Sequence, residues 1–352
     1  MLDENKTGIR YRVTNLQERL GLVGIKSEHI DSIKESKTWD FILKHDAIVV
    51  YRSFLTPTVK SLLSFSKKVG IATVYSIDDL VFGPNLNKEI SFLKGRDEEE
   101  IRDFGQAVEE YERAIKEFDF LLVSTEGLKK AGEILGKKTF VVKNGFSLAQ
   151  MQISEKALRD KNAAAPKTDL ILGYFSGTNT HDKDFSLITP QLLKIMEALP
   201  FVKLKIVGPL ALGNEFNRFE ERVLKKDYVD WRYLPYEIAE VDINLAPLEV
   251  NSFTNAKTEL KYFEAGLLKV PTIATPTKPF LEAIEHGKNG LLASSSLDWL
   301  NNISELVGNK DLRLAMGKAA HKDTISNYSP ISQAETTKKV FQDIIKNYKS
   351  EN

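Results

Sequence analysis

Two charged side chains near the middle of the second half of the chain have the spacing of a site for a phosphorylated ligand. Lys257 and Glu264 are seven residues apart, so on one helix they lie roughly 10 Å apart along the axis, about the span of a diphosphate joined to a ribose. Asn255 is a cap residue that can begin such a helix, whose free N–H groups attract phosphate. The alternative is an exposed salt-bridged face, because Lys257, Lys261 and Glu264 have i,i+4 and i,i+3 spacing.

A second candidate stretch follows the apolar run at residues 170–175. It contains Gly177, which lets the backbone approach a ligand, Thr178, which supplies a hydroxyl, and Lys183, which supplies positive charge. This combination suits an anion, although the glycine spacing of a P-loop or of a dinucleotide fingerprint is missing. The alternative is a polar loop between a strand and a helix.

Asp78 and Asp79 form an acidic pair directly after the apolar run at residues 71–75. Two carboxylates at the carboxyl end of a strand can bind a metal ion or a sugar hydroxyl, and they can equally form an Asx-type turn with a helix cap. The five histidines have no metal-like spacing, and the chain has no cysteine, which excludes thiolate metal sites and disulfides. We therefore expect no metal and no cofactor.

The elements that must position these side chains alternate between short buried strands and amphipathic helices, which predicts an α/β fold with parallel sheets. Ligands of such sheets bind beyond the carboxyl ends of the strands. One helix is expected after the cap residues that begin at 251, and it ends before Pro271. The expected strands are 47–51, 71–75, 120–124 and 139–145, then 170–175, 204–209, 241–247 and 270–275.

Length and composition predict two domains and exclude several classes of protein. The 352 residues suffice for two cores, with a domain at 1–150, a linker near 147–168 and a second domain at 165–331. The 49 basic residues balance 49 acidic ones, which argues against a nucleic-acid binder. No apolar run approaches the roughly 20 residues of a membrane span. We expect a cytoplasmic protein, and a peripheral contact with the inner face of a membrane stays open.

The run from Asn255 to Gly266, followed by Val270-Pro-Thr-Ile-Ala and by Ile284-Glu-His-Gly-Lys-Asn-Gly-Leu-Leu-Ala, resembles the donor-binding signature of GT-B glycosyltransferases of family 4. The resemblance implies two Rossmann-like domains facing a cleft, the first completed by a C-terminal helix at 332–352 and the second binding a nucleotide-sugar. It implies that Glu264 binds the ribose. Many members carry another Glu eight residues earlier, near the transferred sugar, where this chain has Ala256.

The same resemblance assigns further residues. Lys183 fits the lysine of the loop that holds the diphosphate, whereas Thr178 stands roughly where that loop has an arginine. Gly208 ends a strand where the nucleobase usually rests against the backbone. Asp78 stands at the position of a histidine near the reacting sugar, and a carboxylate there changes the available chemistry. Lys257 or nearby hydroxyl groups are expected to compensate for the missing arginine.

The resemblance implies a glycosyltransferase that moves a sugar from a nucleotide diphosphate to a glycan, lipid-linked or protein acceptor, retaining and metal-independent, in the synthesis of bacterial surface polysaccharide or glycoconjugates. Two other functions stay open. A noncatalytic binding or scaffold subunit is favoured by Ala256, by Thr178 and by the absence of the family's first strand, which indicates either a truncated start or a strand supplied in another way. A nucleotide-sugar epimerase would use Asp78, Asp79 or His181 as acid or base.

Overall fold

The computed structural model describes residues 7–30, 36–83, 86, 97–163, 168–177 and 182–351. The chain folds into two compact units. The first comprises Met1–Gly145, Asn251–Thr258 and Pro330–Asn352, and the second comprises Phe146–Val250 and Glu259–Ser329. Most of the predicted donor-binding signature therefore belongs to the second unit, whereas its first residues, through Thr258, pack with the first unit.

The first unit is built on four parallel strands in the order β1-β2-β3-β4. Within the described residues no strand precedes β1, and residues 7–22 are helical instead. They form α1 (Thr7–Ile9), the π-helix η1 (Arg10–Thr14) and α2 (Asn15–Leu22). The strands are β1 (Ala47–Tyr51), β2 (Ala72–Ser76), β3 (Phe120–Val123) and β4 (Thr139–Val141).

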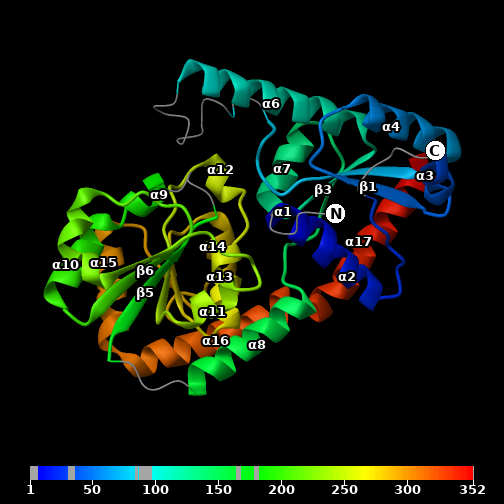
Figure 1. Ribbon diagram of the computed structural model, residues 1–352. Helices are drawn as coiled ribbons and strands as arrows, with labels where there is room; N and C mark the ends of the chain where they lie inside the picture. Colours follow the sequence, from blue (N-terminus) through cyan, green and yellow to red (C-terminus); the bar gives the residue numbers. More distant parts are fainter. Residues whose placement is uncertain are drawn as a thin grey trace. The chain divides into compact units, whose positions relative to one another are not determined.

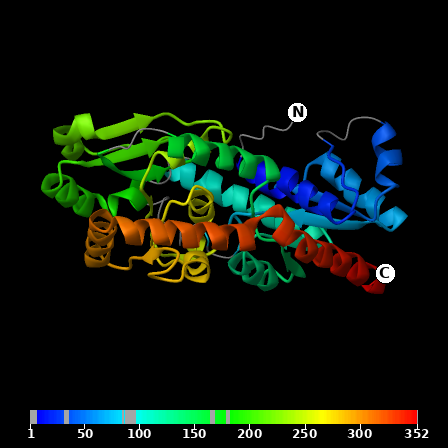
Figure 2. The same ribbon diagram turned by 90° about the horizontal axis from the view of Figure 1, so that it is seen from below.

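Side-chain caps set the starts of the helices between these strands, because each cap accepts a hydrogen bond from a free backbone N–H. Thr56, Asp97 and Thr125 cap α4, α6 and α7 in this way. The helices are α3 (Ser36–Ile42), α4 (Pro57–Val69), α6 (Glu98–Glu117), α7 (Glu126–Ile134), α12 (Ser252–Asn255) and α17 (Pro330–Glu351). α17 packs along α2, and Figure 2 shows the two side by side.

The second unit is built on six parallel strands in the order β10-β9-β8-β5-β6-β7. Every residue of β5 is buried, as expected of a central strand of a sheet covered on both faces. Figure 1 shows β5 and β6 beside α10 and α15, which pack on each other through the large apolar core of this unit. The strands are β5 (Leu170–Phe175), β6 (Val202–Val207), β7 (Val223–Lys226), β8 (Ile243–Ala246), β9 (Thr272–Ala274) and β10 (Leu291–Leu292).

The helices of the second unit include α13, which carries Glu264 and packs closely on α16. Gly266 and Gly317 make this approach possible: a methyl group at Gly266 would lie 2.2 Å from the Thr324 hydroxyl oxygen, and one at Gly317 would lie 2.0 Å from the Lys269 carbonyl oxygen. The helices are α8 (Leu148–Ala163), α9 (Asp182–Ser186), α10 (Thr189–Ala198), η4 (Asn214–Arg222), α11 (Leu234–Ala239), α13 (Leu260–Leu267), α14 (Lys278–Ala283), α15 (Ser296–Gly308) and α16 (Lys310–Tyr328).

The prediction of one helix that follows the cap residues at 251–255 and ends before Pro271 is wrong. The structure has α12 up to Asn255, a break, and α13 from Leu260. Polar side chains cause the break, because the Thr125 hydroxyl donates to the Ala256 carbonyl and the Asn144 amide donates to the Thr258 hydroxyl. Lys257 is therefore not on the helix of Glu264. The expected separation of roughly 10 Å along one helix axis does not apply to these two side chains.

None of the described helices is both long enough and apolar enough to cross a lipid bilayer.

Candidate functional site

The carboxyl ends of β5 and β6 meet in close backbone contact in the second unit. The Ser176 N–H donates to the Val207 carbonyl at 2.9 Å, and the Gly208 N–H donates to the Lys226 carbonyl at 2.9 Å. Gly208 has a φ of 94°, and a methyl group on it would lie 1.9 Å from the Ser176 carbonyl oxygen. Only glycine fits both demands. Gly177 is exposed, with open space at its Cα.

Lys183 lies on α9, at the same edge of the sheet. Its neighbour Asp184 is buried and accepts a hydrogen bond from the Glu249 N–H at 2.8 Å, which ties α9 to the segment after β8. Lys183 itself is exposed. Thr178, which the sequence placed in this loop, lies outside the described residues, as does His181.

α13 brings two charged side chains to this unit, Lys261 and Glu264, which are one turn apart on the same side of the helix. The Lys261 ammonium donates to the carbonyl of Phe175, the last residue of β5. It also lies 4.5 Å from the centre of the Tyr174 ring. Glu264 is half-buried. A carboxylate on α13 and a cation at the end of β5 are therefore held together by a single short helix.

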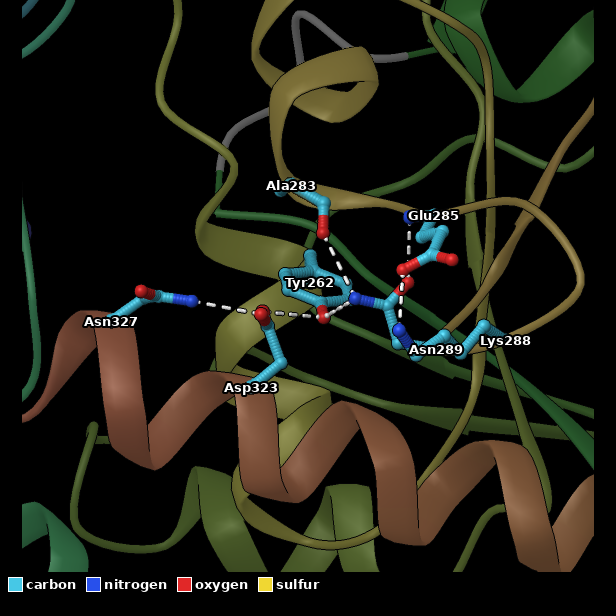
Figure 3. A network of polar contacts seen from close by, with 7 residues as sticks. All are labelled: Tyr262, Ala283, Glu285, Lys288, Asn289, Asp323 and Asn327. Atoms are coloured by element: carbon cyan, nitrogen blue, oxygen red, sulfur yellow. Dashed lines mark hydrogen bonds and ion pairs between the residues drawn. The ribbon is translucent and has the colours of Figure 1, made fainter.

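A network of polar side chains fixes α13 against the turn that precedes β10 (Figure 3). The Tyr262 hydroxyl donates to Asp323 on α16 at 2.8 Å and accepts from the Asn289 amide at 2.8 Å. Asn289 also donates to the Ala283 carbonyl and accepts from the Glu285 N–H. This is the role that the structure gives to the second part of the signature, residues 284–293: it anchors the helix that carries Glu264.

The pKa shifts of the tyrosines preserve the hydrogen bonds that they donate to the carboxylates. Burial raises the pKa of Tyr262, and the neighbouring Asp323 raises it further. The phenol therefore stays protonated and continues to donate to the carboxylate. Tyr328 has the same arrangement at the start of α13: it donates to Glu259 at 2.6 Å, and burial together with that carboxylate raises its pKa.

In the first unit, Asp78 and Asp79 follow β2, and both carboxylates have side-chain partners among the described residues. The Tyr51 hydroxyl donates to Asp78 at 2.9 Å, and Arg52 forms an ion pair with Asp79 at 2.8 Å. Burial, followed by repulsion from Asp79, raises the pKa of Asp78. Arg52 has a φ of 40°, a conformation in which a non-glycine residue is strained. Gly8 packs against the pair, because a methyl group there would lie 1.8 Å from the Tyr51 hydroxyl oxygen.

Buried arginines close the carboxyl edge of this first sheet. Arg12, on the π-helix η1, is 1% exposed and donates to the carbonyls of Val142 and Leu122 at the ends of β4 and β3. Arg19 donates to the Lys143 carbonyl. Burial lowers the pKa of Arg19 to about 9, and the nearby Arg12 lowers it as well. These guanidinium groups therefore bind backbone carbonyls at the carboxyl edge of the first sheet.

The structure thus divides the predicted site residues between the two units. Gly177, Lys183, Gly208 and Glu264 belong to the second unit, whereas Asp78, Asp79, Asn255 and Lys257 belong to the first. The Asn255 N–H donates to the Asn251 carbonyl inside α12, so Asn255 does not begin the helix of Glu264. The Lys257 ammonium lies 4.9 Å from the centre of the Phe253 ring.

Two residues that the sequence analysis did not name as site residues, Lys261 and Arg12, bind backbone carbonyls near the carboxyl ends of strands. Lys261 belongs to the polar stripe of the predicted helix, and its place in the first turn of α13 depends on the break before Leu260, which the sequence did not predict. Arg12 offered no such signal. Among the residues that the structure describes, no cluster of three or more His, Cys, Asp or Glu side chains could hold a metal ion.

Comparison with known proteins connects these features to one family. Residues 170–309 match the family described as "Glycosyl transferases group 1". No curated protein matches the chain in sequence.

Solved structures match over most of the chain. HepE from Anabaena, in complex with UDP and glucose, has a TM-score of 0.59 and 18% identity over 87% of this chain and 80% of its own. Sucrose-phosphate synthase from Thermosynechococcus elongatus has a TM-score of 0.64 and 14% identity over 96% and 93%. A glycosyltransferase from Rickettsia africae has a TM-score of 0.63 and 16% identity over 97% and 96%. At these low identities, the structural matches show that the fold is shared.

Proposed function

We propose that the chain, which shares the GT-B fold and matches the group 1 glycosyltransferases over residues 170–309, moves a sugar from a UDP-sugar to a hydroxyl group of a glycan, lipid-linked or protein acceptor. The uridine base is proposed because HepE, which shares the fold, is found in complexes with UDP and with UDP-glucose. The class of acceptor that we propose is a bacterial surface polysaccharide or glycoconjugate.

One observation carries the proposal: within the second unit, the glycine contact at the end of β6, the exposed Gly177 and the helix of Glu264 converge on the end of β5. The Gly208 and Ser176 backbones pack against each other there, and α13 reaches the Phe175 carbonyl through Lys261. Glycine backbone that a ligand can approach closely, with cations beside it, suits a diphosphate. A carboxylate one turn further along α13 suits the hydroxyl groups of a ribose.

In the proposed reaction the bond between the anomeric carbon and the diphosphate oxygen breaks, and its electron pair stays on the diphosphate. The acceptor oxygen forms a new bond to the anomeric carbon, and its proton passes to the departing phosphate oxygen. The protein has to stabilise the negative charge that builds up on that diphosphate. Lys183 is proposed to do so without a metal ion. We propose retention of the anomeric configuration, which a proton NMR spectrum of the first product would test directly.

The donor-binding test is calorimetry with UDP-glucose, UDP-GlcNAc, GDP-mannose and ADP-glucose. We expect one uridine donor to bind, and Glu264→Gln to weaken it by about tenfold or more, the value of a hydrogen bond to a charged group. Glu305→Gln, an exposed residue on α15, is the matched control and should bind as the wild type does.

A deoxynucleotide sharpens this test, because it removes the partner of Glu264 rather than Glu264 itself. If Glu264 holds the ribose, UDP should lose affinity in Glu264→Gln, whereas 2′-deoxy-UDP should bind both proteins almost equally. Unchanged UDP affinity in the variant would remove Glu264 from the site. Absence of binding for every nucleotide-sugar would overturn the donor assignment altogether.

A further inference from the structure

Two aspartates of the short helix α9 bind the backbones of two different loops in the second unit. The Ala211 N–H, in the loop after β6, donates to Asp182 Oδ1 at 3.2 Å. The Glu249 N–H, in the segment after β8, donates to Asp184 Oδ1 at 2.8 Å. α9 itself follows β5 in the chain, and β5 lies between β8 and β6 in the sheet. α9 therefore holds the segments that follow both neighbours of β5.

The apolar core of the unit supports α9 from beneath. Phe185 of α9 is buried, and the centre of its ring lies 4.9 Å from that of Tyr174 on β5 and 6.2 Å from that of Phe216 on η4. Asp184 is 7% exposed, whereas Asp182 is half-buried. Both carboxylates lie close enough to Tyr174 to raise the pKa of its phenol beyond the effect of burial. The two carboxylates thus stand on a helix that the core fixes in place.

Electrostatics argue against direct contact between these carboxylates and a diphosphate, because like charges repel. Asp182 and Asp184 flank Lys183 in the sequence, so they lie at the edge where the anionic part of the donor is proposed to bind. Their hydrogen bonds point to a different role. Each carboxylate fixes the backbone of one loop at the carboxyl edge of the sheet.

We infer that Asp182 and Asp184 are positioning residues, which hold the loops after β6 and β8 in the arrangement that binds the sugar donor; this inference rests on the proposed function. A loop that is already ordered loses less conformational entropy when the ligand binds. The loop after β6 begins at Gly208, whose close contact with Ser176 belongs to the proposed donor site. The order of that loop therefore contributes to donor affinity.

Calorimetry with UDP tests this inference on the full-length protein, at a temperature well below unfolding. Asp184→Ala removes both the negative charge and the acceptor of the Glu249 N–H, whereas Asp184→Asn removes only the charge. Loss of the charge alone should strengthen UDP binding, because the diphosphate is then repelled less. We expect Asp184→Ala to weaken UDP binding by about tenfold or more, the effect of one lost hydrogen bond to a charged group. Asp184→Asn should bind UDP at least as tightly as the wild type.

The same pair of substitutions at Asp182 repeats the comparison at a more exposed position, where the risk to folding is smaller. The hydrogen bond of Asp182 is longer than that of Asp184, so Asp182→Ala should weaken UDP binding less, by about threefold. Asp182→Asn should again bind at least as tightly as the wild type. Asp160→Ala, an exposed residue on α8, is the matched control and should bind UDP as the wild type does.

Hydrogen exchange of the unliganded protein, followed by mass spectrometry, separates positioning from a general structural role. Asp182→Ala should speed exchange in peptides that cover the loop after β6, and Asp184→Ala in peptides that cover the segment after β8. A residue with only a structural role would lower the melting temperature and leave the UDP affinity of the folded protein unchanged. That pattern would overturn the inference.

Three results of the calorimetry would also overturn it. If the wild type binds UDP and both alanine variants bind it as tightly or more tightly, the carboxylates do not position the loops, while the proposed function stands. Equal losses in Asp184→Ala and Asp184→Asn would show that the hydrogen-bond acceptor is not what matters, and the proposed function would again stand. If the wild type binds none of UDP, GDP and ADP, the proposed function falls and this inference falls with it.

Discussion

The carboxyl edges of the two parallel sheets are built in opposite ways. In the first unit, buried guanidinium groups from the N-terminal helices cover the strand ends, with Arg12 bound to carbonyls of two strands. In the second unit, the strand ends are joined by backbone contacts between Ser176 and Gly208, and the charged groups beside them, Lys183 and Lys261, are exposed or half-buried. The same fold class thus gives one closed edge and one open edge.

This difference indicates which of the two edges is better suited to bind an anionic ligand. Phosphate oxygens need hydrogen-bond donors. At the first edge the guanidinium groups are buried and most of their donors bind backbone carbonyls, although Nη2 of Arg19 has no partner among the described residues. At the second edge, glycine backbone and lysines supply donors beside the strand ends. The first unit adds the acidic pair Asp78 and Asp79, which suits hydroxyl groups rather than phosphate. The comparison therefore supports the proposal that the diphosphate binds to the second unit.

Arg12→Met should have the largest effect on stability, because it removes the guanidinium group that binds carbonyls near the strand ends of the first sheet. The substitution leaves three acceptors of buried residues without this partner: the Val142 carbonyl, the Ser76 hydroxyl and the Asn144 side-chain oxygen. The Leu122 carbonyl also loses Arg12 but still accepts from the Ile77 N–H. At roughly 1–3 kcal/mol for each unsatisfied group, we expect a loss of at least about 3 kcal/mol in the free energy of unfolding. Denaturant unfolding monitored by circular dichroism would measure it.

Arg12→Lys is the matched variant for that experiment, since it keeps the charge but not the planar fork of donors, and it should fall between the wild type and Arg12→Met. A loss below about 1 kcal/mol in Arg12→Met would mean that the edge is not closed by this side chain. The contrast between the two sheets would then lose its main support.

Gly208→Ala tests the close backbone contact between the ends of β5 and β6 in the second unit. The residue has φ 94°, and the added methyl group would meet the Ser176 carbonyl oxygen at 1.9 Å. We expect a loss of about 1–3 kcal/mol, smaller than for Arg12→Met, together with weaker UDP binding because β5 and β6 must separate.

Gly177→Ala provides the comparison within the same edge, because its Cα faces open space. Its melting temperature should stay close to that of the wild type, whatever it does to ligand binding. Equal melting temperatures for the two alanine variants would show that the close contact between the ends of β5 and β6 does not form.

Much of the fold could be predicted from the sequence, because buried strands in parallel sheets read as short apolar runs. The strands at 47–51 and 170–175 were predicted with the bounds that the structure shows. The α/β class with two parallel sheets is confirmed, and residues 170–309 match the expected glycosyltransferase family. The helix expected between the cap residues at 251–255 and Pro271 was predicted too long, because α13 begins only at Leu260. Its break depends on Thr125 and Asn144, which are more than a hundred residues away in the chain, and no local pattern contains them.

The candidate site could be predicted only where residue type alone carried the signal. Gly177, Lys183 and Glu264 were found in this way, and their roles stay predictions. Lys261 was visible as a lysine in a helix, but its carbonyl partner at the end of β5 comes from tertiary structure. Arg12 was hidden for the same reason: a basic residue near the N-terminus is normally solvated, and only the absence of a strand before β1 in the described residues makes room for it.

The smallest predicted effect tests the charge of the closed edge. Burial and Asp79 raise the pKa of Asp78, whereas in the unfolded chain an aspartate loses its proton near pH 4. Above that pH the unfolded state therefore binds fewer protons than the folded state, so Asp78 makes the protein less stable as the pH rises from about 4.

Asp78→Asn is neutral at every pH and keeps an acceptor for the Tyr51 hydroxyl. Its melting temperature relative to the wild type should increase between pH 4 and pH 7, whereas Asp160→Asn, on the exposed side of α8, should show no such trend. A constant difference for Asp78→Asn would mean that Asp78 ionises in the folded protein as it does in the unfolded chain, and the first edge would then carry the full negative charge of its acidic pair.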